Sequence, residues 1–369
     1  MRIPCAAIIM AILTCSIPAF AADLELAPGV WTKITPAGVT MTRENHVFCQ
    51  GVAIDPKHPR TLYLCVCAYD AGKGGLFKTT DGGATWKKIG LLDEPLHLAI
   101  NPDDSNHLYC VDGVRGATLG FWVSRDGGES WTMPEGFKRA TEKPVGTRDL
   151  YSLAVDPIDF KHILVSFHSP WADGRNCGVL ESKDGGESWV AHDPPKSLKG
   201  GYGMAVFFLF DPVKKIGDSN TWLFTAQEGG FFKTTDAGQT WTLVYRSQMT
   251  HGGNQLYRAK NGTLYSGGYQ YPARSADNGT TWEPLKQGLV YSWYMGICGD
   301  GHDVYTATTN EKQPFFKTRE DDGVTWSPLN DQKFSAVPFE MVLDPVNCIL
   351  YSASWEEGLL AIKLDPVNN

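Results

Sequence analysis

The chain has 369 residues, with 33 Lys and Arg against 41 Asp and Glu and a formal net charge of −8 at pH 7. Hydrophobic residues make up 42% and aromatic residues 12%, a globular balance that excludes a mainly disordered chain, a collagen and a coiled coil. The acidic balance and the lack of any Lys/Arg run argue against a nucleic-acid partner. Twelve Trp and 39 Gly together are typical of a β protein rich in turns.

Residues 1–21 have the pattern of a secretory signal peptide. Arg2 supplies a positive start, residues 5–18 are almost wholly apolar, and Ala19-Phe20-Ala21 is a small-x-small cleavage site. The apolar run is too short for a membrane anchor, and no other stretch approaches the roughly 18 apolar residues that span a bilayer. We therefore expect residues 22–369 to form a single domain, secreted or periplasmic, with no membrane span.

Seven cysteines follow the predicted signal peptide. Most of them fall in apolar, strand-like runs, where Cys usually packs as a small hydrophobic side chain. Cys65 and Cys67 are two residues apart on a predicted strand and share one face, so they do not have the spacing of a zinc site. A disulfide from Cys49 to one of these two residues stays open, because their strands are expected to be neighbours.

One motif recurs along the chain and predicts a hairpin turn. Its first copy, TTDGGATW, ends at Trp86, and its last, looser copy, TREDDGVTW, ends at Trp326. The copies between them end at Trp131, Trp189, Trp241 and Trp282. In such a turn Gly supplies positive φ, Asp accepts hydrogen bonds from backbone N–H groups, and Trp packs between strands. The Trp residues are 41 to 58 positions apart, a period typical of propeller blades or a solenoid.

A second repeat precedes the turn motif. Short apolar strands end at an Asx-Pro pair, as at Asp55-Pro56, Asn101-Pro102, Asp156-Pro157 and Asp344-Pro345. A second strand follows, often with a Leu-Tyr pair such as Leu62-Tyr63. One unit is therefore strand A, Asx-Pro turn, strand B, loop, strand C, Asp turn and strand D. Four antiparallel strands per unit predict a β-propeller blade.

The ends of the chain predict seven blades. Six complete units run from about residue 47 to residue 330, and the C-terminal part supplies strands A, B and C over 339–344, 349–354 and 358–363. The missing strand D is at the other end, because Val30–Ile34 matches Thr85–Ile89. We expect this N-terminal strand to complete the C-terminal blade and so close the ring without a free sheet edge. The fold class is an all-β, seven-bladed propeller of four-stranded antiparallel blades.

The S/T-x-D-x-G-x-S/T-W motif is that of the Asp box, so the chain resembles the BNR/Asp-box propellers. These include sialidases, xyloglucan-active hydrolases, sortilin-type receptors and a photosystem assembly factor. The resemblance covers nearly all of residues 22–369 and implies the propeller fold, but it leaves the function open. The boxes brace blades in this superfamily, so it implies structural roles for Asp81, Asp126, Asp184, Asp236 and Asp277.

Strand connectivity predicts that one rim carries function. The Asx-Pro and Asp turns share one rim, with His58, His107, His162 and His302 in structural or solvent-facing positions there. The opposite rim collects B–C loops and D–A crossings, where sites on rigid scaffolds usually lie. Its catalytic candidates are Asp149, Glu228, Glu340, His46, His97, His168, His251 and Tyr151. Its substrate-binding candidates are Arg43, Arg115, Arg148, Trp171, Arg175, Tyr202, Asn254, Tyr269, Trp293 and Trp355.

These residue types suit a saccharide, since aromatic faces stack on sugar rings and Arg, Asn and His bond hydroxyls and carboxylates. Glycoside hydrolysis, which the resemblance favours, needs two carboxylates about 5–9.5 Å apart. The sialidase Arg-Ile-Pro signature occurs only at Arg2-Ile3-Pro4, within the signal peptide, which disfavours a sialidase. The xyloglucan-active relatives bind substrate between two propellers, and this chain has one.

Two alternatives stay open. A lyase acting on a uronate-containing polysaccharide needs a His or Tyr base and a group that neutralises the carboxylate. A propeller that binds a glycan or a protein without chemistry needs no convergent, perturbed groups. We expect no metal and no cofactor, because no His cluster has a metal-ligand spacing. The expected partner is a poly- or oligosaccharide, and the expected state is a monomer.

Overall fold

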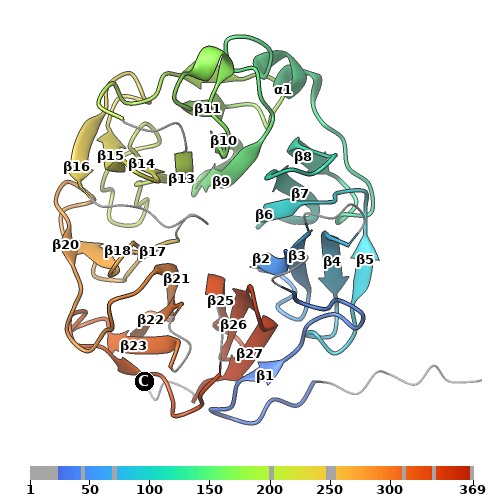
Figure 1. Cartoon of the computed structure of the whole chain (residues 1–369), viewed down its shortest axis with the longest axis vertical. Coiled ribbons are helices and arrows are strands. Elements are labelled where there is room, and N and C mark those ends of the chain that lie inside the picture. Colours follow the sequence, from blue (N-terminus) through green and yellow to red (C-terminus); the bar gives the residue numbers. More distant parts are fainter. Residues whose placement is uncertain are drawn as a thin grey trace, which may run out of the picture.

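A computed structural model describes residues 24–42, 46–68, 73–198, 203–246, 255–309, 313–334 and 338–365. These residues form seven antiparallel sheets set in a ring around a common axis (Figure 1). The predicted seven-bladed propeller is confirmed. Within the described residues, no helix is long and apolar enough to cross a membrane.

The first four sheets follow one another in the chain. The first contains β2 (Val47–Ile54), β3 (Leu62–Ala68), β4 (Gly75–Thr79) and β5 (Lys87–Ile89), and the second β6 (Pro95–Asn101), β7 (Asp104–Asp112) and β8 (Gly120–Ser124). The third contains β9 (Leu150–Asp156), β10 (Asp159–Phe167), β11 (Val179–Ser182) and β12 (Val190–His192), and the fourth β13 (Gly203–Phe208), β14 (Trp222–Ala226), β15 (Gly230–Thr234) and β16 (Thr242–Tyr245). In the second sheet an isolated bridge from Val123 to Thr132 stands where the others have a fourth strand. A short helix, α1 (Glu135–Ala140), lies in the crossing to the third sheet.

Three more sheets complete the ring. The fifth contains β17 (Leu256–Arg258), β18 (Leu264–Ser266), β19 (Ala273–Ser275) and β20 (Glu283–Pro284), and the sixth β21 (Tyr294–Gly299), β22 (Asp303–Thr308), β23 (Phe315–Arg319) and β24 (Ser327–Pro328). The seventh contains β25 (Pro338–Asp344), β26 (Ile349–Ser354), β27 (Gly358–Lys363) and β1 (Thr32–Lys33). Because β1 pairs antiparallel with β27, with Thr32 opposite Ala361, strands from both ends of the chain share one sheet.

The repeated turn is held by its own side chains. In the first copy the Thr79 hydroxyl donates to Asp81 Oδ1 (2.6 Å) and accepts from the Gly83 N–H (3.0 Å), while the Thr85 N–H donates to Asp81 Oδ1 (2.9 Å). Gly82 and Gly83 have φ of 75° and 100°, which a residue with a Cβ adopts only with strain. The Trp86 indole N–H donates to the Gly83 carbonyl. The same bonds from Ser or Thr to Asp recur at Asp126, Asp184, Asp236 and Asp277.

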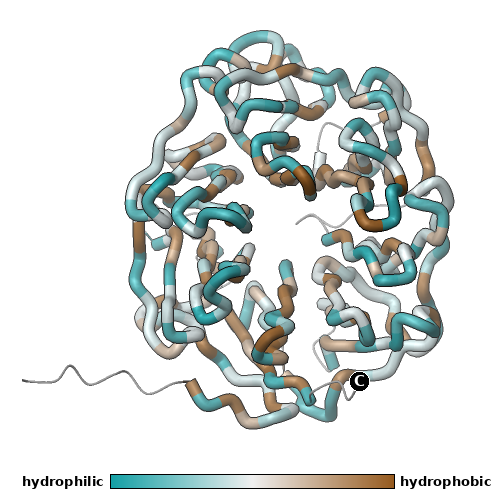
Figure 2. Tube along the Cα trace, turned by 180° about the vertical axis from the view of Figure 1, so that it is seen from behind, coloured by the Kyte–Doolittle hydropathy of each residue, from teal (hydrophilic) through white to brown (hydrophobic). Residues whose placement is uncertain are grey.

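Large apolar side chains fill the spaces within and between sheets. Trp222, Tyr109 and Phe121 are each fully buried, and Trp31 stacks on Phe315 with ring centroids 4.1 Å apart. Figure 2 shows hydrophobic residues recurring along the strands all round the ring, with hydrophilic residues in many of the connections. The core is thus distributed over the ring.

Cysteine pairing was left open by the sequence, and the structure contains no disulfide among its described residues. Cys49, Cys65 and Cys67 are buried free thiols, and so is Cys110. The Cys49 bridge is therefore not formed. Burial raises the pKa of the Cys49 thiol, and these side chains pack as small hydrophobic groups.

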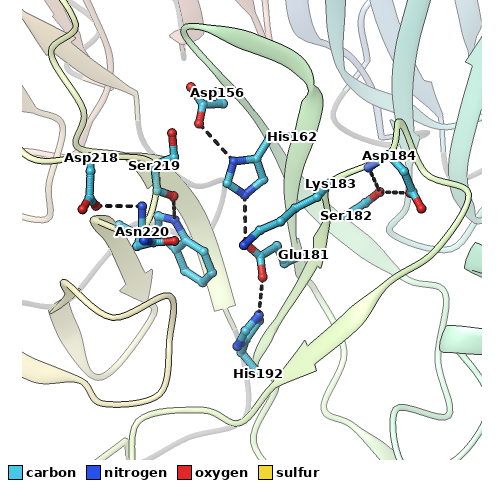
Figure 3. Close-up of polar contacts among 11 residues, drawn as sticks. Asp156, His162, Glu181, Ser182, Lys183, Asp184, His192, Asp218, Ser219 and Asn220 are labelled. Atoms are coloured by element: carbon cyan, nitrogen blue, oxygen red, sulfur yellow. Dashed lines mark hydrogen bonds and ion pairs between the residues drawn. The ribbon is translucent and has the colours of Figure 1, made fainter.

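A buried network of polar side chains, which we call the Glu181 network, joins the turns and strands of the third sheet (Figure 3). His162 lies between two carboxylates, with Nδ1 3.0 Å from Asp156 Oδ2 and Nε2 2.9 Å from Glu181 Oε1. The other oxygen of Glu181 is 2.9 Å from His192 Nε2, and Lys183 Nζ lies 3.2 Å from Oε1. The His192 ring meets Trp222 of the fourth sheet edge to face, so the Glu181 network also stabilises the contact between two sheets. His162 is therefore structural, as expected.

Candidate functional site

The two rims of the ring have different local structure. The turns from strand A to B and from C to D are short and lie at one rim, and the B–C loops and the crossings between sheets lie at the other, which we call the loop face. The Asp residues of the repeated turns bond their own turn, and hydrogen bonds from Ser130 lower the pKa of Asp126 to about 2. The carboxylates of these turns are therefore committed to the turns themselves, and the described sequence candidates lie on the loop face.

Two sequence candidates from distant sheets meet near the axis of the ring. His97 of β6 and Glu340 of β25 place Nδ1 and Oε2 3.7 Å apart. Gln255 joins them from just before β17, with Nε2 3.5 Å from Glu340 Oε1, and the Val52 N–H donates to Glu340 Oε2. Gly51 lies against this group, since a Cβ there would stand 2.8 Å from Glu340 Oε2.

This axial group is held in its neutral forms. Burial raises the pKa of Glu340 to about 8, and burial lowers the pKa of His97 to about 4. Desolvation penalises the charged form of each group, which explains the opposite directions. At neutral pH Glu340 is therefore a protonated carboxyl that can donate a hydrogen bond or a proton.

A second group of candidates gathers at the loop-face end of the third sheet. His168 Nδ1 lies 2.9 Å from Asp149 Oδ2, Ser169 donates to the same oxygen, and the Val114 N–H donates to Oδ1 (2.6 Å). Tyr151 stacks on the His168 ring at 5.4 Å. Burial alone would raise the pKa of Asp149, but these hydrogen bonds outweigh it and leave the pKa below its ordinary value. Asp149 therefore orients the imidazole of His168.

Several substrate-binding candidates near this group have structural contacts. Trp171 is 2% exposed and meets Phe167 edge to face, so its indole belongs to the core. Arg175 lies over the Trp171 ring and bonds the Pro144 carbonyl, and Arg148 Nε donates to Thr141 Oγ1. Arg115 is exposed, with a left-handed φ of 96°.

A pocket of about 330 Å³ opens on the loop face between the fourth and fifth sheets. It is lined by Glu228, Tyr245, Arg246, Tyr269, Gln270, Tyr271, Pro284 and Lys286. Lys286 Nζ stands 5.7 Å from the centre of the Tyr271 ring. Within the described part of the chain, Glu228 and Arg246 form no hydrogen bond or ion pair, so both are available to a ligand.

Aromatic rings continue from this pocket toward the sixth sheet. Tyr269 lies 5.6 Å from Trp293, and Tyr271 meets Tyr291 edge to face at 5.9 Å. Trp293 is 42% exposed and Tyr291 65% exposed. Exposed, neighbouring rings at a pocket mouth offer apolar faces of the kind that sugar rings pack against.

The remaining candidates lie elsewhere or outside the described residues. Trp355 contacts Phe48 and Phe339, with ring centroids 4.8 and 5.6 Å apart, and the exposed His46 ring is 6.5 Å from it. Arg43, Tyr202, His251 and Asn254 lie outside the residues that the structure describes.

One acidic group was not singled out from the sequence. Glu94 accepts from the Ala68 N–H, and its own N–H donates to Asp112 Oδ2 (3.0 Å). Burial raises the pKa of Glu94 to about 8 and that of Asp112 to about 7. Asp112 is fully buried, which makes the pair inaccessible to a large substrate. The sequence signal was Asp93-Glu94 directly before a strand A.

Metal ligation finds no support in the part of the chain that is described. No group of three or more His, Cys, Asp or Glu side chains there could hold an ion.

Comparison with known proteins relates the chain to carbohydrate-active relatives. No family model matches it. It is 30% identical over 277 residues to an oligoxyloglucan-reducing end-specific xyloglucanase of Emericella nidulans, covering 66% of this chain and 31% of that protein. It is 25% identical over 333 residues to a xyloglucanase of Hypocrea jecorina, covering 81% and 34%. The protein is a seven-bladed β-propeller with xyloglucanase homologues. The chain spans about a third of the length of the curated relatives it matches.

Solved structures share the fold at low identity. YCF48 from Cyanidioschyzon merolae superposes with a TM-score of 0.60 at 14% identity, over 93% of this chain and all of that one. An ancestral GH74 enzyme superposes with a TM-score of 0.53 at 14% identity, over 92% of this chain and 56% of that one. At such identity the likeness concerns architecture alone.

Proposed function

We propose that the protein is a secreted or periplasmic carbohydrate-active enzyme, a glycoside hydrolase acting on a poly- or oligosaccharide at the loop face. The observation that carries this proposal is the pocket between the fourth and fifth sheets, where Glu228 and Arg246 have no partner among the described residues and Tyr269 supplies an aromatic face. The xyloglucanase homologues support the substrate class. In this proposal the repeated turns are Asp boxes that brace the blades, and residues 1–21 are a cleaved signal peptide.

The pocket has the composition of a sugar site. A hydroxyl-rich ring packs its apolar face on a phenol or indole and bonds its hydroxyls to charged side chains at the edge. Tyr269 and Trp293 supply such faces, and Glu228 and Arg246 line the same pocket with groups that can bond hydroxyls. An oligosaccharide extending along the rings would reach the sixth sheet. The proposed partner is therefore a glycan, bound by a monomer, with no nucleic acid involved.

Hydrolysis takes a pair of carboxyl groups. Glu228 is the carboxylate proposed within the pocket. The second carboxyl is sought among Glu340, which is protonated at neutral pH, and Asp149, which is ionised. As the partner of Glu228, a protonated Glu340 has the state that a general acid requires, and an ionised Asp149 has the state that a base or nucleophile requires.

A second candidate function is a polysaccharide lyase. It is favoured by the Asp149–His168 pair, in which the carboxylate orients an imidazole stacked on Tyr151. A His oriented in this way is suited to remove the proton next to a uronate carboxylate. The products separate the two functions, because elimination leaves an unsaturated uronate and hydrolysis does not.

The test is incubation of the purified protein with a panel of polysaccharides, following new reducing ends and the ultraviolet absorbance of unsaturated products together. Reducing ends alone support the hydrolase, and both signals together support the lyase. Glu228→Gln and Tyr269→Ala are expected to lower activity at least about 100-fold and 10-fold. Glu187→Gln, an exposed position on a repeated turn at the opposite rim, is the matched control and is expected to retain wild-type activity. Binding without cleavage overturns the hydrolase and favours a propeller that binds a glycan without chemistry. A panel with neither cleavage nor binding overturns the substrate class as well.

A further inference from the structure

The pocket between the fourth and fifth sheets carries more positive than negative charge. Arg246 follows β16 and Lys286 follows β20, and both line the pocket with one carboxylate, Glu228. All three side chains are exposed. The chain as a whole has a net charge of −8, so the pocket and the whole chain have net charges of opposite sign. A cationic site on an anionic protein attracts anions selectively.

We propose that this pocket binds an acidic saccharide, with the carboxylate or sulfate of one sugar unit held between Arg246 and Lys286. The inference rests on the proposed function and names its substrate class. Guanidinium and ammonium groups form strong, charge-assisted hydrogen bonds with such anions, and a planar guanidinium pairs with a carboxylate through two parallel bonds. A neutral glycan would leave one carboxylate, Glu228, against the two cations in the bound state.

The cations are not committed to the fold. Two arginines of the fifth sheet show the contrast. Arg258 donates to the Leu209 carbonyl (3.1 Å) and to Asn278 Oδ1 (2.7 Å), and Arg274 Nε lies 2.6 Å from Glu283 Oε1. Within the described residues Arg246 has no such bond, and Lys286 has only its contact with the Tyr271 ring. Their charges are therefore available for a ligand without breaking an existing pair.

The tyrosine loop of the pocket is anchored in advance of binding. Gly268 and Tyr294 exchange backbone hydrogen bonds of 2.7 and 3.0 Å, and the Ser292 N–H donates to the Gln270 carbonyl (3.1 Å). These bonds join the loop that carries Tyr269 and Tyr271 to the sixth sheet. Because the loop is already ordered, little conformational entropy is lost when a sugar stacks there.

Matched pairs of glycans test the inference directly. Binding of the purified protein is measured by calorimetry to polygalacturonate and to its carboxyl-reduced form, and to a sulfated galactan and its desulfated form. The inference predicts that at least one acidic form binds at least about tenfold more tightly than its neutral partner, with affinity that falls as salt is added. The pair that shows the difference identifies the anion.

Variants assign the effect to the two cations. The Arg246→Gln, Lys286→Gln double variant is expected to lose the tenfold preference, because its affinity for the acidic form falls more than its affinity for the neutral partner. The matched control, Arg125→Gln with Lys161→Gln, removes two exposed cations from the opposite rim and is expected to keep the preference. Equal affinity of the wild type for acidic and neutral forms, or an unchanged preference in the pocket variant, overturns the inference and leaves the proposed function standing. Failure to bind any glycan overturns the proposed function itself.

Discussion

The Glu181 network supports a quantitative prediction about the free energy of unfolding. The Glu181 residue is 5% exposed, and its two oxygens face His162 and His192 at 2.9 Å each and Lys183 at 3.2 Å. Glu181→Gln keeps the volume but removes the charge, so His162 Nε2 and His192 Nε2 lose their charged acceptor, while Asp156 still bonds His162 Nδ1. Removing the charged acceptor of a buried hydrogen bond costs about 1.5–3 kcal/mol. We expect the free energy of unfolding to fall by that amount and the Tm by about 2–4 °C.

The matched control is Lys183→Gln. The Lys183 side chain is 62% exposed, so its ion pair with the same carboxylate is screened by water. An exposed pair contributes about 0–1 kcal/mol. Urea unfolding followed by tryptophan fluorescence measures both variants, and equal losses in the two would refute the argument that burial decides the magnitude.

The pH dependence provides a second, independent check. Burial opposes ionisation of Glu181, but the hydrogen bonds from His162, His192 and Lys183 outweigh burial and hold its pKa well below the ordinary value. A depressed folded-state pKa contributes stability above the unfolded-state pKa, near 4.5 for Glu, and loses it as pH falls toward the folded-state value. The difference between wild type and Glu181→Gln is therefore expected to be constant from neutral pH down to about 5 and to shrink below it. A difference that stays constant through acid pH would refute the reasoning.

Three further perturbations have definite outcomes. Trp31→Ala is expected to cost about 3–5 kcal/mol in urea unfolding, because the side chain is 5% exposed and stacks on Phe315 beside the strand that completes the seventh sheet. Asp126→Ala is expected to cost about 1–2 kcal/mol, since one turn loses the hydrogen bonds that it accepts from Ser130. In the wild type, Glu340 binds a proton in the folded state between pH 4.5 and about 8, so stability falls as pH rises through that window. Glu340→Gln is expected to flatten that slope.

Each of these three predictions can be refuted by a measured stability. A Trp31→Ala variant as stable as the wild type would mean that the seventh sheet does not depend on its N-terminal strand. An Asp126→Asn variant, which keeps one acceptor oxygen, should lose less than Asp126→Ala, and an equal loss would assign the cost to the backbone. An unchanged pH slope in Glu340→Gln would show that another group holds the proton.

Most of the architecture was predictable because short sequence motifs, repeated along the chain, specify the local geometry of each blade. The turn that ends at Trp86 closes through bonds among residues two to four positions apart, so its sequence specifies its geometry. The match between Val30–Ile34 and the repeat strands predicted the outer strand of the seventh sheet, where β1 now lies. The irregular second sheet, with a bridge at Thr132 in place of a strand, was not anticipated.

The loop face was predictable as a region but not in its contacts. Asp149, His168 and Tyr151 were named separately, and their association depends on how a crossing and a loop pack. Trp171 is an aromatic residue in a long loop, as expected of a sugar-binding residue, yet its indole is buried in the core. Lys286 gave no sequence signal because it is an ordinary charged residue after a short strand.

By itself, the sequence determined the number of blades, the turn that joins their outer strands and the face on which irregular loops gather, because each of these follows from short-range periodicity. Only the tertiary structure decided which side chains meet. His97 and Glu340 approach within 3.7 Å from the second and seventh sheets, and Glu228 and Lys286 share a pocket from the fourth and fifth. Closure of the ring brings together residues that are distant in the sequence. Where such residues are buried against one another, as at Glu340, desolvation shifts their pKa values and so sets their protonation states.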